Sequence, residues 1–243
     1  MKKLVLAAAL LVPVLANAGS NTHWEYSGKA GPKHWGELNE AFEACSSGLN
    51  QSPVNLRGFI ESDLNTVSFN YQTGGKDVVN NGHAVQVNYA PGSTIELDNH
   101  TFELKQFHFH SPSENQIDGK SYPMEAHLVH ADKAGNLAVI SVMFEENEAN
   151  STIGKVWSQM PENEGGKEML SAAVAVDGIL PANRDYYRFN GSLTTPPCSE
   201  GVLWLVMKQS VTASKAQIEK FSRVLEHANN RPIQALNSRS VLQ

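Results

Sequence analysis

Two histidines separated by a single residue are the first feature of this sequence that could do chemistry. The stretch Gln106-Phe-His-Phe-His110 alternates aromatic and imidazole side chains, a pattern typical of a β-strand. Successive side chains of a strand point to opposite faces, so His108 and His110 share one face while Phe107 and Phe109 share the other. The spacing therefore places two imidazoles side by side, where both can bind one metal ion.

A second strand-like segment supplies a third imidazole. Glu125-Ala-His127-Leu-Val129 has the same period of two, and as a neighbouring strand it would bring His127 next to the first pair. Glu125 lies on the same face and is a candidate hydrogen-bond acceptor for a ligand ring. Three neutral imidazoles leave the fourth tetrahedral position of zinc open for water, which is the arrangement of catalytic rather than structural zinc sites.

The histidines alone leave two other functions open. His108, His110 and Glu114 have the ligand spacing of the cupin barrels, in which three histidines and a carboxylate typically bind the iron or manganese of an oxygenase. However, Phe102 stands where the leading glycine of the cupin motif belongs, and no second cupin motif follows. The other alternative is a secreted binding module without chemistry. Such a module would be expected to have lost a ligand histidine.

Short strands separated by turns account for most of the chain. Alternating or aromatic-rich runs predict strands over residues 66–71, 84–89, 94–97, 101–110, 124–131, 137–144 and 202–208. The separators, such as Asn80-Asn-Gly82 and Pro91-Gly-Ser93, have the composition of turns rather than of helical crossovers. Strands joined by turns predict a mostly antiparallel sheet.

Two helices are predicted, and no boundary divides the chain into domains. Apolar residues at helical spacing predict one helix over residues 153–160. A capping box formed by Ser214 and Gln217 predicts a second helix that reaches Leu225. Both helices are expected at the periphery of the sheet. Since no linker, repeat or low-complexity tract interrupts residues 19–243, we expect a single domain.

The first 18 residues have the composition of a secretory signal peptide. Lys2 and Lys3 precede an apolar run over residues 4–15, and Ala16-Asn-Ala18 then offers a small-residue cleavage site. The apolar run is shorter than the roughly 20 residues that a membrane-spanning helix needs. We therefore expect cleavage after Ala18, a mature domain over residues 19–243 with no membrane span, and a periplasmic or secreted protein.

Charge and cysteine content agree with an exported protein that does not bind nucleic acid. The formal net charge of −6 becomes −8 once Lys2 and Lys3 are removed, and the charges are scattered rather than grouped. This distribution lacks the basic patch of a nucleic-acid-binding surface. Cys45 and Cys198 are the only cysteines, and in an oxidising compartment they predict one long-range disulfide.

Short motifs spread over nearly all of residues 19–243 resemble the alpha-class carbonic anhydrases. Each is weak alone, but together and in this order they are specific: Gln51-Ser-Pro-Val-Asn55, Asn81-Gly-His83, Phe107-His-Phe-His110, Ser113-Glu114, Glu125-Ala-His-Leu-Val-His130, Gly191-Ser-Leu-Thr-Thr-Pro-Pro197 and Arg231-Pro-Ile-Gln234. The resemblance implies a mainly β (α+β) single domain around a twisted, largely antiparallel sheet of about ten strands, with a few peripheral short helices. It also implies reversible hydration of carbon dioxide to bicarbonate and a proton, by attack of zinc-bound hydroxide.

The resemblance further implies the residues of the metal site. His108, His110 and His127 resemble the ligands of one Zn²⁺ per chain. Three positions resemble the groups that orient the ligand rings and select their neutral tautomer, namely Gln106, Glu125 and the backbone near Asn229. Thr194 resembles the residue that accepts the hydrogen of the hydroxide and donates its own to Glu114.

Residues for the substrate and the proton follow from the same resemblance. The apolar pocket for carbon dioxide would be lined by Val129, Val139, Leu193, Val202 and Trp204, with Thr195 at the anion side. His83 resembles a proton shuttle, and the polar residues that order the intervening water would be Tyr26, Asn81 and Gln86. Gln86 stands where other members often have Asn. Bacterial members are often dimers, so the resemblance also implies a homodimer.

Overall fold

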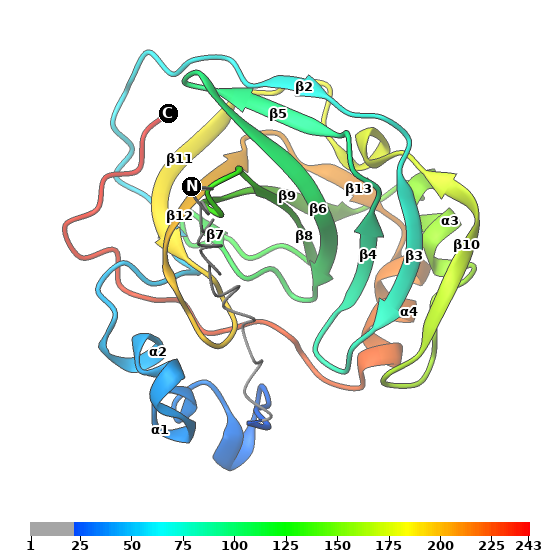
Figure 1. Cartoon of the computed structure of the whole chain (residues 1–243), viewed down its shortest axis with the longest axis horizontal. Coiled ribbons are helices and arrows are strands. Elements are labelled where there is room, and N and C mark those ends of the chain that lie inside the picture. Colours follow the sequence, from blue (N-terminus) through cyan, green and yellow to red (C-terminus); the bar gives the residue numbers. More distant parts are fainter. Residues whose placement is uncertain (1–21) are drawn as a thin grey trace, which may run out of the picture.

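A strongly twisted sheet of 11 strands forms the body of the molecule (Figure 1). The computed structural model describes residues 22–243, so the predicted signal peptide lies outside the described residues. The main path of the sheet runs in the order β10 (Lys167–Val174), β3 (Gly75–Asn80), β4 (Val85–Tyr89), β6 (His100–His110), β8 (Met124–Ala131), β9 (Leu137–Glu146), β12 (Glu200–Met207) and β11 (Tyr186–Ser192).

Five shorter strands complete the β structure. Three belong to the large sheet, where β2 (Ser68–Asn70) pairs with β5 (Thr94–Leu97), β5 pairs with β6, and β13 (Val211–Ala213) pairs with β9. The other two, β1 (Asn55–Leu56) and β7 (Gln116–Ile117), form a separate parallel pair. All seven strands predicted from the sequence are confirmed, as β2, β4, β5, β6, β8, β9 and β12.

The sheet is largely antiparallel, as expected, but it is mixed because two pairings at one end are parallel. β12 pairs with residues 138–141 of β9 in parallel, and β13 pairs in parallel with residues 144–146 of the same strand. Only residues 208–210 separate β12 from β13, so the two act as one interrupted strand running beside β9. The long connection from β9 to β12 provides the crossover that parallel strands require.

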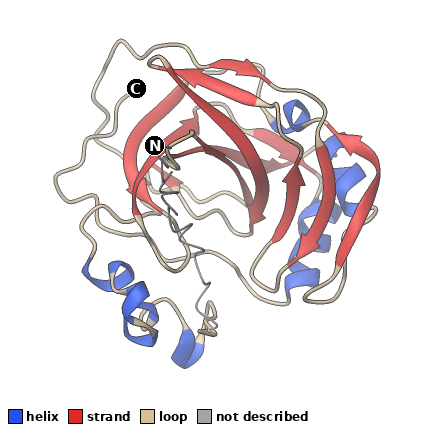
Figure 2. Cartoon of the chain, in the orientation of Figure 1, coloured by secondary structure: helices blue, strands red, loops and turns tan. Residues whose placement is uncertain are grey.

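Short helices lie at the edges of the sheet (Figure 2). They are α1 (Trp35–Leu38), α2 (Ala44–Ser47), α3 (Ser151–Trp157) and α4 (Lys215–Leu225), with 3₁₀ turns η1 (Gly28–Ala30), η2 (Glu40–Phe42) and η3 (Val176–Ile179). The predicted capping box is present, since Ser214 and Gln217 exchange side-chain to backbone hydrogen bonds at the start of α4. Within residues 22–243, no helix combines the length and apolar character needed to cross a membrane.

The two faces of the central strands carry different kinds of side chain. Phe107 and Phe109 are fully buried in a large apolar core on one face. Burying each such side chain contributes about 1.5–3 kcal/mol to folding, which fixes the register of β6. The three histidines therefore lie on the opposite face, which we call the histidine face.

Candidate metal centre and active site

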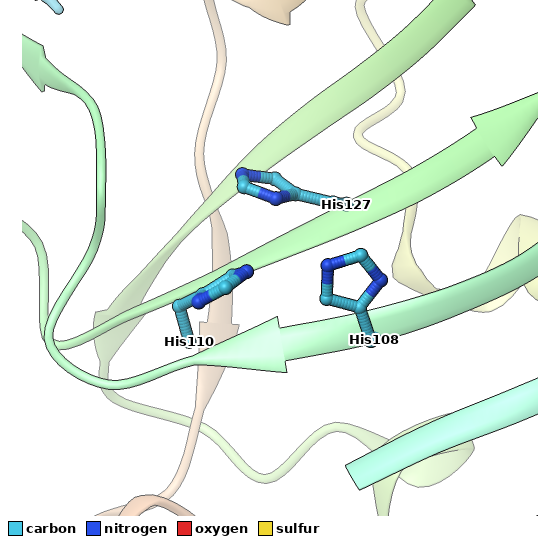
Figure 3. Close-up of side chains that lie close together, drawn as sticks. All are labelled: His108, His110 and His127. Atoms are coloured by element: carbon cyan, nitrogen blue, oxygen red, sulfur yellow. The ribbon is translucent and has the colours of Figure 1, made fainter. Parts of the chain in front are cut away.

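His108, His110 and His127 converge on one point of the histidine face. His108 and His110 come from β6, and His127 comes from the adjacent strand β8, where it pairs directly with His108. Figure 3 shows the three rings turned toward one another. One nitrogen from each ring can be chosen so that all three lie within 4.8 Å of one another. The structure thus brings together the three residues that sequence parity placed on one face.

Each of these rings is held by a hydrogen-bond acceptor on its outer nitrogen. His108 Nδ1 lies 2.8 Å from Gln106 Oε1, and His110 Nδ1 lies 2.7 Å from the backbone oxygen of Asn229. His127 Nε2 lies 2.8 Å from Glu125 Oε1. Because these oxygens can only accept, each outer nitrogen carries the proton and the inner nitrogen of a neutral ring keeps its lone pair.

Burial favours the neutral form of the first two rings. It lowers the pKa of His108 well below the ordinary value for histidine, and the neighbouring His110 and His127 lower it further. Burial also lowers the pKa of His110, although the Asn229 carbonyl opposes part of this shift. Neutral imidazole is the form that binds a metal.

Glu125 is a buried carboxylate with all of its acceptor sites in use. Oε2 accepts from the backbone N–H groups of Glu114 and Asn115, at 2.7 and 2.8 Å. Oε1 accepts from Asn115 Nδ2, Ser141 Oγ and His127. Burial alone raises the pKa of Glu125, but His127, Ser141 and Asn115 together bring it down to about 2. A fixed anion therefore orients the His127 ring.

Two buried polar atoms lack a partner in this part of the described chain, and both face the point where the histidines meet. They are His110 Nε2 and Glu114 Oε2, which lie 3.5 Å apart. A buried lone pair without a partner is costly, and a cation at this point would satisfy the lone pair of His110 Nε2. The converging donor atoms are those of the three histidines and do not include Glu114. Three neutral nitrogens with one open position fit zinc.

Thr194 lies buried beside Glu114, in the turn that joins β11 to β12. The pKa of Glu114 is raised to about 7, because burial outweighs the opposing effects of His127, the Arg231 backbone N–H and the Thr194 hydroxyl. The turn itself is closed by hydrogen bonds from Leu193 N to Ser199 O and from Cys198 N to Thr195 O. The hydroxyl, the carboxyl group and the histidine cluster are therefore neighbours.

The predicted disulfide between Cys45 and Cys198 is confirmed, with a Cα–Cα distance of 5.0 Å. It ties the turn that carries Thr194 to α2, in a small buried cluster with Trp35 and Phe42. The link spans 153 residues of sequence. A constraint on so long a loop removes much conformational freedom from the unfolded chain.

Removing this disulfide should therefore cost stability. A Cys45→Ala/Cys198→Ala variant is expected to lose about 2–4 kcal/mol in the free energy of unfolding, mainly because its unfolded chain is less constrained. Urea unfolding of the oxidised protein and of the variant, followed by circular dichroism, measures the difference. Equal midpoints and slopes for the two proteins would contradict the prediction.

The apolar residues predicted to line a pocket occur in one cluster next to His127. Val139, Val202 and Trp204 are buried, and Val129 and Leu193 pack against them partly exposed. β8, β9 and β12 supply four of the five, and the Trp204 ring meets the His127 ring edge to face at 4.9 Å. Thr195 follows Thr194 in the adjoining turn. The apolar surface and the histidine cluster are thus contiguous.

His83 follows a tight turn in which Gly82 has a φ of 82°, a conformation that favours glycine. The Asn81 side chain holds this turn by accepting from the backbone N–H groups of His83 and Ala84. The His83 ring stacks on Trp24, with centroids 3.7 Å apart. Burial lowers the pKa of His83 from its ordinary value, and Glu164 opposes part of the shift.

Several residues that support the site were missed by the sequence analysis. Trp24 is one of them, and its ring stacks on that of His83. Ser141 and Asn115 bond to Glu125, and the buried Arg231 donates its backbone N–H to Glu114 at 2.9 Å. These partners lie far from the histidines in sequence or on a different strand. Short-range spacing carries no information about them.

Of the predicted polar residues, Tyr26 and Gln86 differ in their surroundings. The Tyr26 hydroxyl is buried without a partner in the described part of the chain, and burial raises its pKa well above the ordinary value. Gln86 pairs with His108 across β4 and β6 and is partly exposed on the histidine face.

Comparison with known proteins gives consistent results. The family model for eukaryotic-type carbonic anhydrase matches residues 30–243. A carbonic anhydrase from Pectobacterium carotovorum is 48% identical, over 99% of this chain and 98% of the relative. The alpha-carbonic anhydrase of Thermovibrio ammonificans, solved with the inhibitor sulfanilamide, is 48% identical, with a TM-score of 0.90 over 91% of this chain and 99% of that one. Dioscorin DB3S from Dioscorea polystachya is 32% identical, over 98% of this chain and 92% of the relative.

Proposed function

This chain belongs to the eukaryotic-type, or alpha, carbonic anhydrase family, and we propose that it catalyses the reversible hydration of carbon dioxide to bicarbonate and a proton with one zinc ion. The observation that carries the proposal is the convergence of three histidines beside an apolar surface and a buried hydroxyl. The family membership and the fold exclude the cupin alternative. The silent binding module would be expected to lack a ligand histidine, whereas all three are present here.

The histidines His108, His110 and His127 would hold the zinc through their inner nitrogens. When bound there, zinc lowers the pKa of a water molecule to about 7, the value established for carbonic anhydrases in general. Gln106, Glu125 and the Asn229 carbonyl keep the rings in the tautomer and orientation that the metal needs.

Thr194 and Glu114 would orient the attacking oxygen. A carboxylate at Glu114 can only accept hydrogen bonds, so the Thr194 hydroxyl would donate a hydrogen bond to it. The Thr194 oxygen is then available as an acceptor. That acceptor then fixes the remaining hydrogen of the nucleophile and aims a lone pair at the substrate. Arg231 N–H holds the other oxygen of Glu114 in place.

The apolar cluster at Trp204 and Val139 would receive carbon dioxide. A gas without charge or hydrogen-bond donors gains from apolar contacts and needs no polar partner to bind there. Val129, Leu193 and Val202 complete this surface, and Thr195 would lie at the side where bicarbonate develops its charge.

His83 would carry the proton away from the site. Imidazole has an ordinary pKa of about 6.5, close to that of the water activated by zinc, so neither direction of transfer is steeply uphill. Tyr26, Asn81 and Gln86 would order the water between the two. Asn81 also has a structural role, because its side-chain oxygen accepts the backbone hydrogen bonds that stabilise the turn before His83.

A location outside the cytoplasm, in the periplasm or the medium, is supported by the leader-like composition of residues 1–18 and by the disulfide. The domain over residues 19–243 would be the mature enzyme. Its small-molecule partners would be carbon dioxide and bicarbonate, and a homodimer is still the expectation from bacterial relatives.

Two measurements on the purified protein test the proposed function. Zinc analysis should give one ion per chain, and stopped-flow assays with a pH indicator should record hydration of carbon dioxide. Sulfanilamide should inhibit this activity, since the enzyme of Thermovibrio ammonificans was solved with it as an inhibitor. A protein that holds zinc in the stated ratio but does not hydrate carbon dioxide would refute the proposal.

A His83→Ala variant should separate proton export from attack on carbon dioxide. A group of pKa about 7 releases protons to water at roughly 10³ s⁻¹ at most, which is about 10¹⁰ M⁻¹s⁻¹ multiplied by 10⁻⁷ M. Faster turnover needs a local carrier, so kcat should fall in dilute buffer while kcat/KM for carbon dioxide stays nearly unchanged. Added imidazole should restore part of kcat.

The matched control for this variant is His100→Ala, which removes an exposed histidine at the far end of β6. It should leave both kinetic parameters unchanged in dilute buffer. An unchanged kcat in the His83 variant, or an equal fall in kcat and kcat/KM that imidazole does not relieve, would remove His83 from the mechanism.

A further inference from the structure

A chain of hydrogen-bonded side chains crosses the histidine face, from the neighbour of His108 to the edge of the sheet. Gln86 Nε2 donates to Asn88 Oδ1 at 2.7 Å, and Asn88 Nδ2 donates to Asp77 Oδ1 at 2.5 Å. Lys167 Nζ lies 3.4 Å from the same carboxylate oxygen. β4, β3 and β10 supply these residues in order.

Strand pairing places this chain next to the candidate metal centre. On β4, Gln86 pairs with His108 and Asn88 pairs with Gln106, so both share the histidine face with those residues. Asp77 of β3 pairs with Asn88 and is only 2% exposed. The buried carboxylate of Asp77 is thus linked by two hydrogen bonds, through Asn88, to Gln86, which lies beside the proposed metal ligand His108.

The carboxylate sets the direction of every hydrogen bond in the chain. Asp77 Oδ1 faces two donors and can only accept, so Asn88 must turn its NH₂ group toward it. The carbonyl of Asn88 then faces Gln86 and requires a donor, which the Gln86 NH₂ group provides. The Gln86 carbonyl is left over, and it accepts no hydrogen bond from a residue of the described chain.

We propose that Asp77 is a positioning residue that acts through Asn88 to make Gln86 present a hydrogen-bond acceptor, rather than a donor, to the water beside His108. The inference deepens the proposed function, since that water would belong to the path from the metal centre to His83. The side-chain amide of Gln106 is fixed in the opposite orientation, with its donor group free. Its carbonyl accepts from His108, which leaves its NH₂ group as a donor on the same face.

The Gln86 carbonyl would then always accept and the Gln106 NH₂ group would always donate. Together they give the water on this face one preferred orientation. If the Gln86 amide could turn over, donors would face donors and the ordered path would be lost for part of the time. Proton export depends on this order, whereas attack on carbon dioxide at the apolar side does not. The effect is therefore expected in kcat and not in kcat/KM.

The first test is an Asp77→Asn variant, studied by NMR in the zinc-free protein. Asparagine can donate or accept, so both directions of the chain become accessible and the Gln86 NH₂ group loses its fixed partner. Hydrogen exchange of the Gln86 side-chain amide should become about 3- to 10-fold faster, which is the loss of one ordinary hydrogen bond. The matched control Asp98→Asn removes a carboxylate paired with Arg188 elsewhere and should leave this exchange unchanged.

The second test is a double-mutant cycle between Asp77→Asn and Gln86→Glu, read as kcat in dilute buffer. Gln86→Glu alone puts acceptors at both ends of Asn88, so its carbonyl faces a carboxylate and kcat should fall. In the double variant, the amide introduced at position 77 donates to Asn88, and Asn88 donates to the carboxylate introduced at position 86. The second oxygen of that carboxylate restores the acceptor. The double variant should therefore exceed the Gln86→Glu variant by about 3- to 10-fold in kcat, with kcat/KM unchanged.

These outcomes separate positioning from simple structural support. If Asp77 only balanced the charge of Lys167, the two substitutions would combine additively and no rescue would appear, which would overturn the inference. Unchanged amide exchange in Asp77→Asn would overturn it as well. The exchange experiment needs no catalysis, so it still decides the orientation of Gln86 if the wild-type protein fails to hydrate carbon dioxide and the proposed function is wrong.

Discussion

A His127→Ala variant is expected to lose bound zinc and, with it, nearly all hydration of carbon dioxide. Loss of a residue that only orients a ligand typically costs 10- to 100-fold in metal affinity, and loss of the ligand itself should cost more than about 100-fold. The His127 ring also lies between Glu125, which accepts its outer N–H, and the Trp204 ring, so its removal leaves Glu125 without that donor. Alanine at His108 or His110 should have the same result. Zinc content after dialysis against a chelator and stopped-flow hydration measure both effects.

Glu125→Gln gives the graded comparison for this prediction. Its side-chain NH₂ group would meet the donors of Glu114 and Asn115, so the His127 ring loses its fixed anion but keeps its nitrogen. Zinc affinity should fall by the smaller factor of about 10- to 100-fold. His100→Ala should bind zinc normally. Full zinc occupancy and full activity in any one of the three ligand variants would show that the ligand assignment is wrong.

The part of the site that the sequence could predict is the part held within single strands. Parity alone put His108 with His110 and Glu125 with His127, because a strand fixes the direction of alternate side chains. Gln106 and Glu125 each contact a histidine two residues away, within reach of the same argument. The pairing of β6 with β8 was plausible from the turn-rich connection between them, and the register placed His108 opposite His127.

Contacts between distant segments could not be predicted in this way. The Asn229 carbonyl meets His110 across 119 residues, and no local pattern marks that contact. It was expected only from the family resemblance. The same limit applies to Ser141, whose hydroxyl reaches Glu125 from β9. Hydrogen bonds of this kind depend on the order of strands in the sheet, which hydrophobic spacing does not specify.

Two of the strands that the sequence analysis missed, β10 and β11, have a physical explanation. β10 lies at the edge of the sheet, and only Leu170 and Val174 of its eight residues are buried, so it lacks the alternation of a half-buried strand. β11 carries Arg188 and Asn190 among its aromatic residues and ends in Gly191 and Ser192. Its pairing with β12, rather than its own pattern, makes it a strand.

A Thr194→Ala variant should keep its zinc and lose catalytic efficiency. The hydroxyl touches no ligand nitrogen in the proposed arrangement, and its work is to link the nucleophile to Glu114. Removing it leaves the nucleophile free to rotate and leaves the carboxylate without one donor. Loss of such positioning and hydrogen bonding typically costs about 10- to 1000-fold in kcat/KM. Thr194→Ser keeps the hydroxyl and should lose much less than the alanine variant.

Zinc retention is the measurement that discriminates between the roles of Glu114. In our proposal its carboxylate accepts hydrogen bonds from Thr194 and from the backbone N–H of Arg231, which lies 2.9 Å away. Glu114→Gln should then resemble Thr194→Ala, with a full complement of zinc and a low kcat/KM, because an amide can offer a donor where an acceptor is needed. If Glu114 were itself a ligand, its oxygen 3.5 Å from His110 Nε2 would close onto the metal, and the glutamine variant would bind zinc much more weakly. Weaker zinc binding in Glu114→Gln, with normal binding in Thr194→Ala, would overturn the assignment of three histidines and one open position.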